Sequence, residues 1–156
     1  MLSDKVKEDI KRVFDDYANK RSACMAALQI IQGVKGHLTD EDMRELAQLL
    51  EVNNVQIQEV GAFYSMYNVA HPVGKHHIQV CANLPCSLLG AEHLVNFIER
   101  MLGIKVNGTT PDKKFTLSTV ECLGSCATAP MMQINDTYYE NLTEEKVRDI
   151  LNSLKK

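Results

Sequence analysis

The chain lacks several features that mark common classes of protein. It has no tryptophan, and none of its apolar runs approaches the length that spans a bilayer. Its first five residues have no apolar run of the kind found in signal peptides, so we expect a cytoplasmic location. The net charge of −3 leaves no basic surplus for nucleic acid. A glycine-rich loop of the Rossmann or Walker type is also missing, which argues against nucleotide binding by this chain.

The composition is that of a folded protein with two parts. Of the 156 residues, 45% are apolar and 24% are charged, and a chain of this length can bury a genuine core. The spacing of apolar residues changes from helical to alternating near His71-Pro72-Val73-Gly74. We therefore expect an α+β chain, with an N-terminal four-helix bundle over residues 1–74 and a small α/β domain over residues 75–156.

The first part has four segments in which apolar residues recur every three or four positions. Polar residues that can cap a helix stand at or near the start of each segment, at Ser3, Ser22, Thr39 and Asn53. Short connections between four amphipathic helices are typical of a small antiparallel bundle.

The fourth of these helices is expected to bury Val55, Val60, Phe63 and Met66 and to end near Tyr67. Phe63 is assigned to packing, whereas Tyr64 and Tyr67 could serve either packing or a partner surface. Gly61 lowers helix stability, and we expect it to mark close packing or a bend.

The second part has the pattern of a small α/β sheet. Strands are expected at 75–81, 115–120, 131–135 and 137–139, with helices at 90–101 and from Thr143 to the end. The order β-α-β-β-α is thioredoxin-like if the first two strands are parallel.

Four of the five cysteines form two close pairs in this second part. Cys81 and Cys86 have four residues between them, and Cys122 and Cys126 have three. Thiols in a reducing compartment are normally not joined as disulfides, and neither pair has the spacing of a thioredoxin active site. Four thiolates that converge suit Zn²⁺ or an iron–sulfur cluster.

The spacing does not by itself decide between zinc and iron–sulfur. Gly124, inside the second pair, favours the cluster because glycine permits tight turns whose N–H groups can point at bridging sulfides. A cysteine-based reductase is a third possibility. Cys24 stands alone within a helix and is assigned to packing, as is the Met131-Met132 pair. The five histidines are not assigned as ligands, and of His76 and His77, which alternate sides of a strand, at most one is expected to face the core.

Nearly the whole chain resembles the thioredoxin-like [2Fe–2S] ferredoxin subunit of NADH:quinone oxidoreductase (the complex I 24 kDa-type subunit) and its relatives in NAD-linked hydrogenases and formate dehydrogenases. The residues that carry this resemblance are Gly61-Ala62-Phe63-Tyr64-Ser65-Met66-Tyr67, Pro72-Val73-Gly74-Lys75-His76, Ile78-Gln79-Val80-Cys81, Thr110-Pro111-Asp112, Glu121-Cys122-Leu123-Gly124-Ser125-Cys126, Ala129-Pro130 and Asn135-Asp136-Thr137-Tyr138-Tyr139. Two departures lie beside the cysteines: Ser125 stands where alanine is common, and Ala127-Thr128 where Gly-Asn is common.

The resemblance implies that Cys81, Cys86, Cys122 and Cys126 bind the iron of one [2Fe–2S] cluster. It implies a one-electron carrier that docks against a larger subunit holding FMN and oxidising NADH, with no catalytic residue and no turnover of its own. The chain would then be an electron-transfer subunit of an NADH dehydrogenase complex, peripheral to the membrane, and could form a homodimer when isolated.

The parent complex stays open at this point. The same role in an NAD-linked hydrogenase, a formate dehydrogenase or an electron-bifurcating complex fits the pattern equally. From a different class, a zinc-stabilised interaction domain is the alternative.

Overall fold

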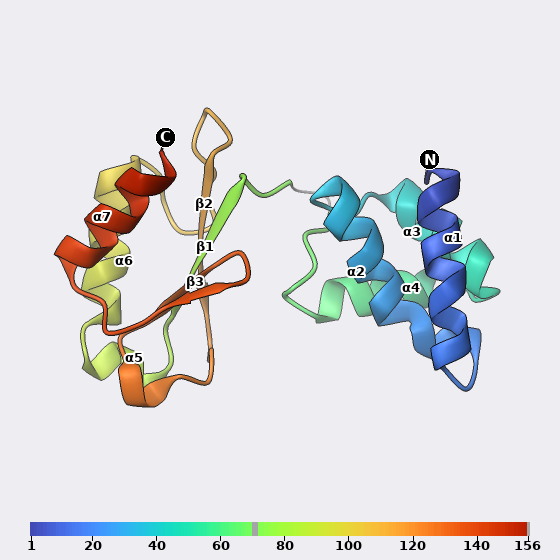
Figure 1. Cartoon of the computed structure of the whole chain (residues 1–156), viewed down its shortest axis with the longest axis horizontal. Helices are drawn as coiled ribbons and strands as arrows, with labels where there is room; N and C mark the ends of the chain where they lie inside the picture. The colour runs from blue at the N-terminus through green and yellow to red at the C-terminus, as the bar shows by residue number, and fades with distance from the viewer. Residues whose placement is uncertain (70–71, 156) are drawn as a thin grey trace. The chain divides into compact units, whose positions relative to one another are not determined.

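The computed structural model describes residues 1–69 and 72–155, so His71, expected at the boundary, lies outside the described residues. The chain divides into two compact units, Met1–Pro72 and Val73–Lys156 (Figure 1). Among the described residues, no helix combines the length and the apolar character needed to cross a membrane.

The N-terminal unit is helical, as expected. Its α-helices are α1 (Asp4–Val13), α2 (Cys24–Lys35), α3 (Asp40–Leu50) and α4 (Asn54–Phe63), with short 3₁₀ turns η1 (Phe14–Asp16) and η2 (Lys20–Ala23) between α1 and α2. The Ser3 side chain accepts a hydrogen bond from the Val6 N–H, and Thr39 and Asn53 form capping boxes with Asp42 and Gln56. The core draws on all four helices, through Ile10, Leu28, Ile31, Met43, Leu46 and Ile57.

The side of α4 that faces the core differs from the expectation. Val55 is 54% exposed and Phe63 is 80% exposed, so their assignment to the core was wrong. The buried positions are Ile57 and Gly61, one turn apart. Val55 precedes Ile57 by two residues, which is the opposite side of a helix with about 3.6 residues per turn.

Gly61 explains why the sequence pattern pointed to the wrong side. A Cβ built on Gly61 would lie 3.5 Å from Met43 Sδ and 3.4 Å from Val69 Cγ2, so the missing side chain permits close packing. Helix α4 also ends at Phe63, which leaves Met66 exposed beyond the helix. Tyr67 is buried, and its hydroxyl donates a hydrogen bond of 2.9 Å to the Met25 carbonyl oxygen.

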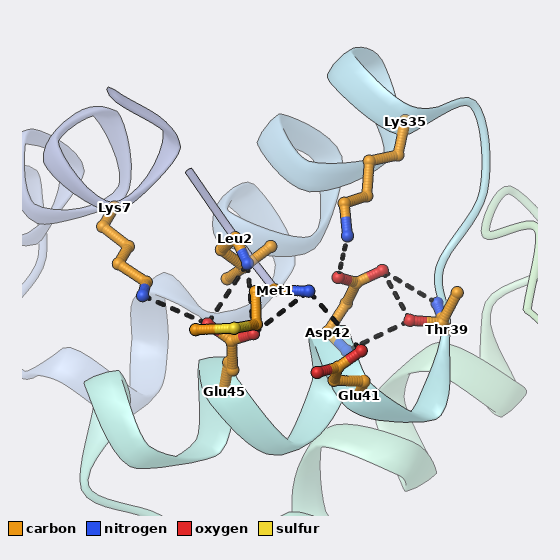
Figure 2. A network of polar contacts seen from close by, with 8 residues as sticks. All are labelled: Met1, Leu2, Lys7, Lys35, Thr39, Glu41, Asp42 and Glu45. Atoms are coloured by element: carbon orange, nitrogen blue, oxygen red, sulfur yellow. Dashed lines mark hydrogen bonds and ion pairs between the residues drawn. The ribbon is translucent and has the colours of Figure 1, made fainter. Parts of the chain in front are cut away.

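Two carboxylates on α3 tie the helices of this unit together (Figure 2). Asp42 is fully buried, pairs with Lys35 of α2, and accepts hydrogen bonds from the Thr39 hydroxyl and N–H. Burial alone would raise the pKa of Asp42, but the Lys35 and Thr39 hydrogen bonds outweigh it and lower the pKa below its usual value. Glu45 accepts from the Leu2 N–H and pairs with Lys7.

The C-terminal unit has one sheet in the order β2-β1-β3-β4. The strands are β1 (His76–Cys81), β2 (Phe115–Val120), β3 (Met132–Ile134) and β4 (Thr137–Tyr139). Strands β1 and β2 are parallel, and the other neighbours are antiparallel, which satisfies the condition for a thioredoxin-like domain. Helices α6 (Ala91–Leu102) and α7 (Glu144–Leu154) pack together against the sheet (Figure 1). Met131 and Met132 are completely buried, so their assignment to packing is confirmed.

A short helix, α5 (Leu84–Leu88), begins between Cys81 and Cys86, includes Cys86, and was not expected. The Asn83 side chain caps it by accepting a hydrogen bond of 2.8 Å from the Leu84 N–H. A helix of this length is too short to show periodicity in the sequence.

Candidate metal centre

Both cysteine pairs follow strands that end at the same edge of the sheet. In the parallel register of β1 and β2, Cys81 lies opposite Val120, and Cys122 comes two residues later. The carboxyl ends of parallel strands lie at the same end of the sheet, so strand pairing brings the two cysteine pairs close in space although they are far apart in the sequence. Cys86 lies on α5, and Cys126 begins the 3₁₀ turn η3 (Cys126–Thr128).

The first pair is buried and its two thiols interact. Burial raises the pKa of Cys86, and the neighbouring Cys81 and Cys126 raise it further. Burial also opposes ionisation of Cys81, but the N–H groups of Asn83 and Leu123 and the Cys86 thiol outweigh it and lower the Cys81 pKa. A lowered pKa favours the thiolate form of Cys81, and the thiolate is the form that binds metals.

The second pair lies on an exposed loop whose backbone turns toward sulfur. Gly124 has φ +77°, in the left-handed region, and its N–H lies 3.4 Å from Cys122 Sγ. A side chain is disfavoured at this φ, which accounts for glycine at this position. The loop thus contains a tight turn at Gly124 with an N–H directed at the Cys122 sulfur.

Cys81, of the first pair, contacts the backbone of the loop that carries the second pair. Cys81 Sγ lies 3.6 Å from the Glu121 carbonyl oxygen, and the Leu123 N–H also reaches this sulfur. These two backbone groups flank Cys122. Cys126 lies close enough to Cys86 to influence the pKa of the Cys86 thiol. The structure therefore brings all four predicted residues to one edge.

Four free thiols supply the number of ligands that a two-iron cluster requires. Within residues 1–69 and 72–155, no three His, Cys, Asp or Glu side chains converge as ligands of one ion. A structural zinc needs four ligands around one metal, whereas a [2Fe–2S] cluster divides four thiolates between two irons. All five cysteines are free thiols. The site offers two pairs of free sulfurs, with N–H groups directed at Cys81 and Cys122, which is the ligand arrangement that a [2Fe–2S] cluster uses.

The other candidate side chains are occupied elsewhere. Cys24 is buried in α2, in the other unit, where burial raises its pKa, so its assignment to packing is confirmed. His77 Nε2 lies 2.7 Å from Ser118 Oγ, and His93 Nε2 lies 2.8 Å from Glu144 Oε1.

Two residues hold the second cysteine loop in a role that the sequence pattern did not predict. The Tyr138 hydroxyl donates a hydrogen bond of 2.8 Å to the Leu123 carbonyl oxygen. The Glu140 carboxylate accepts hydrogen bonds from the Ser125 and Thr128 hydroxyls. Tyr138 and Glu140 are alternate residues at the end of a strand, which was the only signal in the sequence that their side chains share a face.

The fold and the paired cysteines define the class as a thioredoxin-like domain with a four-cysteine centre. The chain belongs to the thioredoxin-like [2Fe-2S] ferredoxin family, whose family model matches residues 10–155. The resemblance inferred from the sequence motifs is thereby confirmed.

Two named relatives are similar over most of their length. The chain is 42% identical over 150 residues to the E 2 subunit of NADH-quinone oxidoreductase from Rhizobium meliloti (strain 1021), covering 96% of this chain and 89% of that protein. It is 45% identical over 145 residues to the E subunit of NADH-quinone oxidoreductase from Rickettsia felis, covering 92% and 86%.

A solved structure has the same fold. In the crystal structure of an NAD⁺-reducing [NiFe]-hydrogenase in the H₂-reduced state, the matching region has a TM-score of 0.74 and 18% sequence identity. It covers 85% of this chain but 22% of the hydrogenase chain, so the likeness concerns the fold alone.

Proposed function

We propose that this chain is the one-electron carrier subunit of an NADH:quinone oxidoreductase-type complex and exchanges electrons with FMN on an NADH-oxidising partner. The observation that carries the proposal is the meeting of two cysteine pairs at one edge of a thioredoxin-like sheet. Family membership and the relatives from NADH-quinone oxidoreductase support it. The same role in an NAD-linked hydrogenase is the second candidate, and the solved hydrogenase structure shares the fold.

In this proposal Cys81, Cys86, Cys122 and Cys126 hold one [2Fe–2S] cluster. The bound cluster supplies the redox chemistry, accepting and releasing one electron. The protein supplies N–H groups directed at sulfur, among them those of Leu123 toward Cys81 and Gly124 toward Cys122. Such donors stabilise negative charge on the sulfurs, which both permits burial of the centre and sets its potential.

The partner surface is proposed to include α5. Leu84, Leu88 and Leu89 are all exposed, and they flank the buried Cys86. Electron exchange requires the flavin to come close to the cluster, so an apolar surface beside a cluster ligand suits a partner that carries FMN. FMN and NAD would then be bound by that partner alone. In the absence of the partner, the same leucines would be available for homodimer formation.

Substitution of an α5 leucine tests this surface. Leu88→Glu places a charge at a residue that is 77% exposed and should leave the cluster intact. We expect it to weaken co-purification with the co-expressed NADH-oxidising subunit several-fold. Val34→Glu, at an exposed residue of α2, is the matched control and should bind normally. Equal retention of the partner by both variants would contradict the proposed surface.

We further propose that residues 1–74 and 75–156 are separate domains and that the second holds the cluster. The division into two compact units supports this proposal. The peripheral, cytoplasmic location follows from the proposed complex.

The decisive experiment is anaerobic reconstitution followed by analysis of iron and acid-labile sulfide. We expect about two irons and two sulfides per chain and a paramagnetic signal on reduction. Cys24→Ala should keep the full content, whereas Cys86→Ser should lose most of it. Stoichiometric zinc without sulfide would refute the proposal in favour of a zinc-stabilised interaction domain.

A further inference from the structure

The second cysteine loop is fastened to the end of strand β4. Strand β4 lies at the edge of the sheet and is followed by Glu140 and Asn141. Residues two apart on a strand point to the same side, so Tyr138 and Glu140 can act on one neighbour together. Both of them contact the segment from Leu123 to Thr128.

Four hydrogen bonds, made by three consecutive or near-consecutive residues, hold this segment. The Tyr138 hydroxyl donates to the Leu123 carbonyl oxygen at 2.8 Å, directly after Cys122. Glu140 Oε1 accepts from the Thr128 hydroxyl at 2.6 Å and from the Ser125 hydroxyl. The Asn141 N–H donates to the Thr128 carbonyl oxygen at 2.7 Å.

The two hydroxyls that Glu140 holds flank Cys126. Ser125 precedes this cysteine directly, and Thr128 follows it by two residues. The hydroxyls also lie 2.8 Å from each other, so one carboxylate oxygen and two hydroxyls form a compact cluster around the backbone of Cys126. Cys122 and Cys126 are themselves exposed, so packing does little to fix them. The polar contacts from the end of β4 and the residue after it therefore restrain the backbone on both sides of these cysteines.

We propose that Tyr138 and Glu140 are positioning residues for the metal centre, and that the Glu140 charge also lowers its reduction potential. This inference rests on the proposed function. Tyr138 would fix the backbone after Cys122, and Glu140 would fix both sides of Cys126, so that the two thiolates are preorganised for binding. A fixed negative charge beside the centre disfavours the added electron, because reduction makes the centre more negative.

The local chemistry keeps Glu140 ionised. Hydrogen bonds from the Ser125 and Thr128 hydroxyls lower the Glu140 pKa below its ordinary value, so the side chain is a carboxylate at neutral pH. A carboxylate is also the better acceptor for two hydroxyl donors than a neutral amide.

Three substitutions in the full-length, reconstituted chain separate the positioning of the cysteine loop from the effect of the Glu140 charge on the reduction potential. Tyr138→Phe removes only the hydroxyl that reaches Leu123. Glu140→Gln keeps an acceptor oxygen but removes the charge, and Glu140→Ala removes both. Tyr139→Phe is the control for the hydroxyl, and Glu145→Gln, in the first turn of α7, is the control for the charge.

The measurements are the rate of iron release to a chelator, the midpoint potential by redox titration, and amide hydrogen exchange of residues 122–128 in the metal-free chain. We expect Tyr138→Phe and Glu140→Ala to release iron several-fold faster and to exchange these amides faster than the controls. We expect Glu140→Gln to raise the midpoint potential while changing iron release less than Glu140→Ala.

The outcomes distinguish this inference from the proposed function. If the unaltered chain takes up no iron and sulfide, the proposed function fails. If it takes up the cluster, and the three variants match their controls in iron release, exchange and potential, the role of Tyr138 and Glu140 is overturned. A potential that is unchanged in Glu140→Gln refutes the charge effect.

Discussion

Replacing Gly124 by alanine tests how closely the backbone of the second cysteine loop is tied to the centre. Gly124 has φ +77°, and a Cβ built there meets no atom within 4 Å. The cost of the substitution is therefore conformational and not steric. The left-handed region costs a residue with a side chain about 1–2 kcal/mol, and the reduced freedom of the unfolded chain returns about 0.4–1 kcal/mol. We expect a net loss of about 1 kcal/mol.

Gly103→Ala provides a control with the same cost in the same unit. Gly103 ends α6 with φ +68°, and a Cβ built there also meets nothing within 4 Å. Both variants should therefore lower the melting temperature of the metal-free protein similarly, by about 4–8 °C for a unit of this size. Thermal unfolding followed by circular dichroism measures this loss.

The two variants should differ once the cluster is bound. Relaxation of the strained residue in Gly124→Ala would turn its N–H away from Cys122 Sγ, where it now lies at 3.4 Å. A lost donor to sulfur lowers the midpoint potential, because negative charge on the reduced centre is less stabilised. Redox titration should show this shift for Gly124→Ala but not for Gly103→Ala. Equal potentials in both variants, at equal stability, would refute a role for the Gly124 N–H.

Two further predictions concern the N-terminal unit. Asp42→Asn should lower its stability at pH 7 by roughly 1–3 kcal/mol, because the buried carboxylate that contacts Lys35 and Thr39 loses its charge. The folded-state pKa of Asp42 is lowered, so its contribution is present above the unfolded carboxyl pKa of about 3.9 and is lost as pH falls through the folded value. Urea unfolding at pH 7 and pH 3 should therefore show a smaller acid loss for Asp42→Asn than for Asp40→Asn, an exposed control, and parallel profiles would contradict this. Ile57→Ala should cost about 2–5 kcal/mol, whereas Phe63→Ala, at an exposed ring, should cost under about 1 kcal/mol, and the reverse order in denaturant unfolding would contradict the observed face of α4.

The sequence predicted the parts of the centre that depend on local patterns. Strand alternation before Cys81 and before Cys122 was enough to expect both residues at strand ends, and the parallel pairing of β1 and β2 then places them at one edge. The tight turn at Gly124 could be predicted because left-handed backbone has a clear preference for glycine.

The features that could not be predicted are of three kinds: a packing position occupied by glycine, a helix too short to show a period, and a contact between residues far apart in the sequence. Gly61 carries no hydrophobic signal, so the apolar Val55 and Phe63 indicated the wrong side of α4. Helix α5 is shorter than two turns and leaves no period to detect. The contact between Glu140 and Ser125 joins a strand end to a loop, and no spacing rule links such residues.

The parallel pairing of β1 and β2 also bears on how the protein is made. The chain leaves β1, builds α5 and α6, and only then returns to lay β2 beside β1. A nascent polypeptide that has emerged from the ribosome only as far as α6 contains the first thiol pair, but β2 is still missing, so β1 and β2 have not yet paired. Delivery of iron and sulfide by an assembly scaffold would thus have to wait until the crossover is complete, so occupancy of all four thiols would report that this unit has folded.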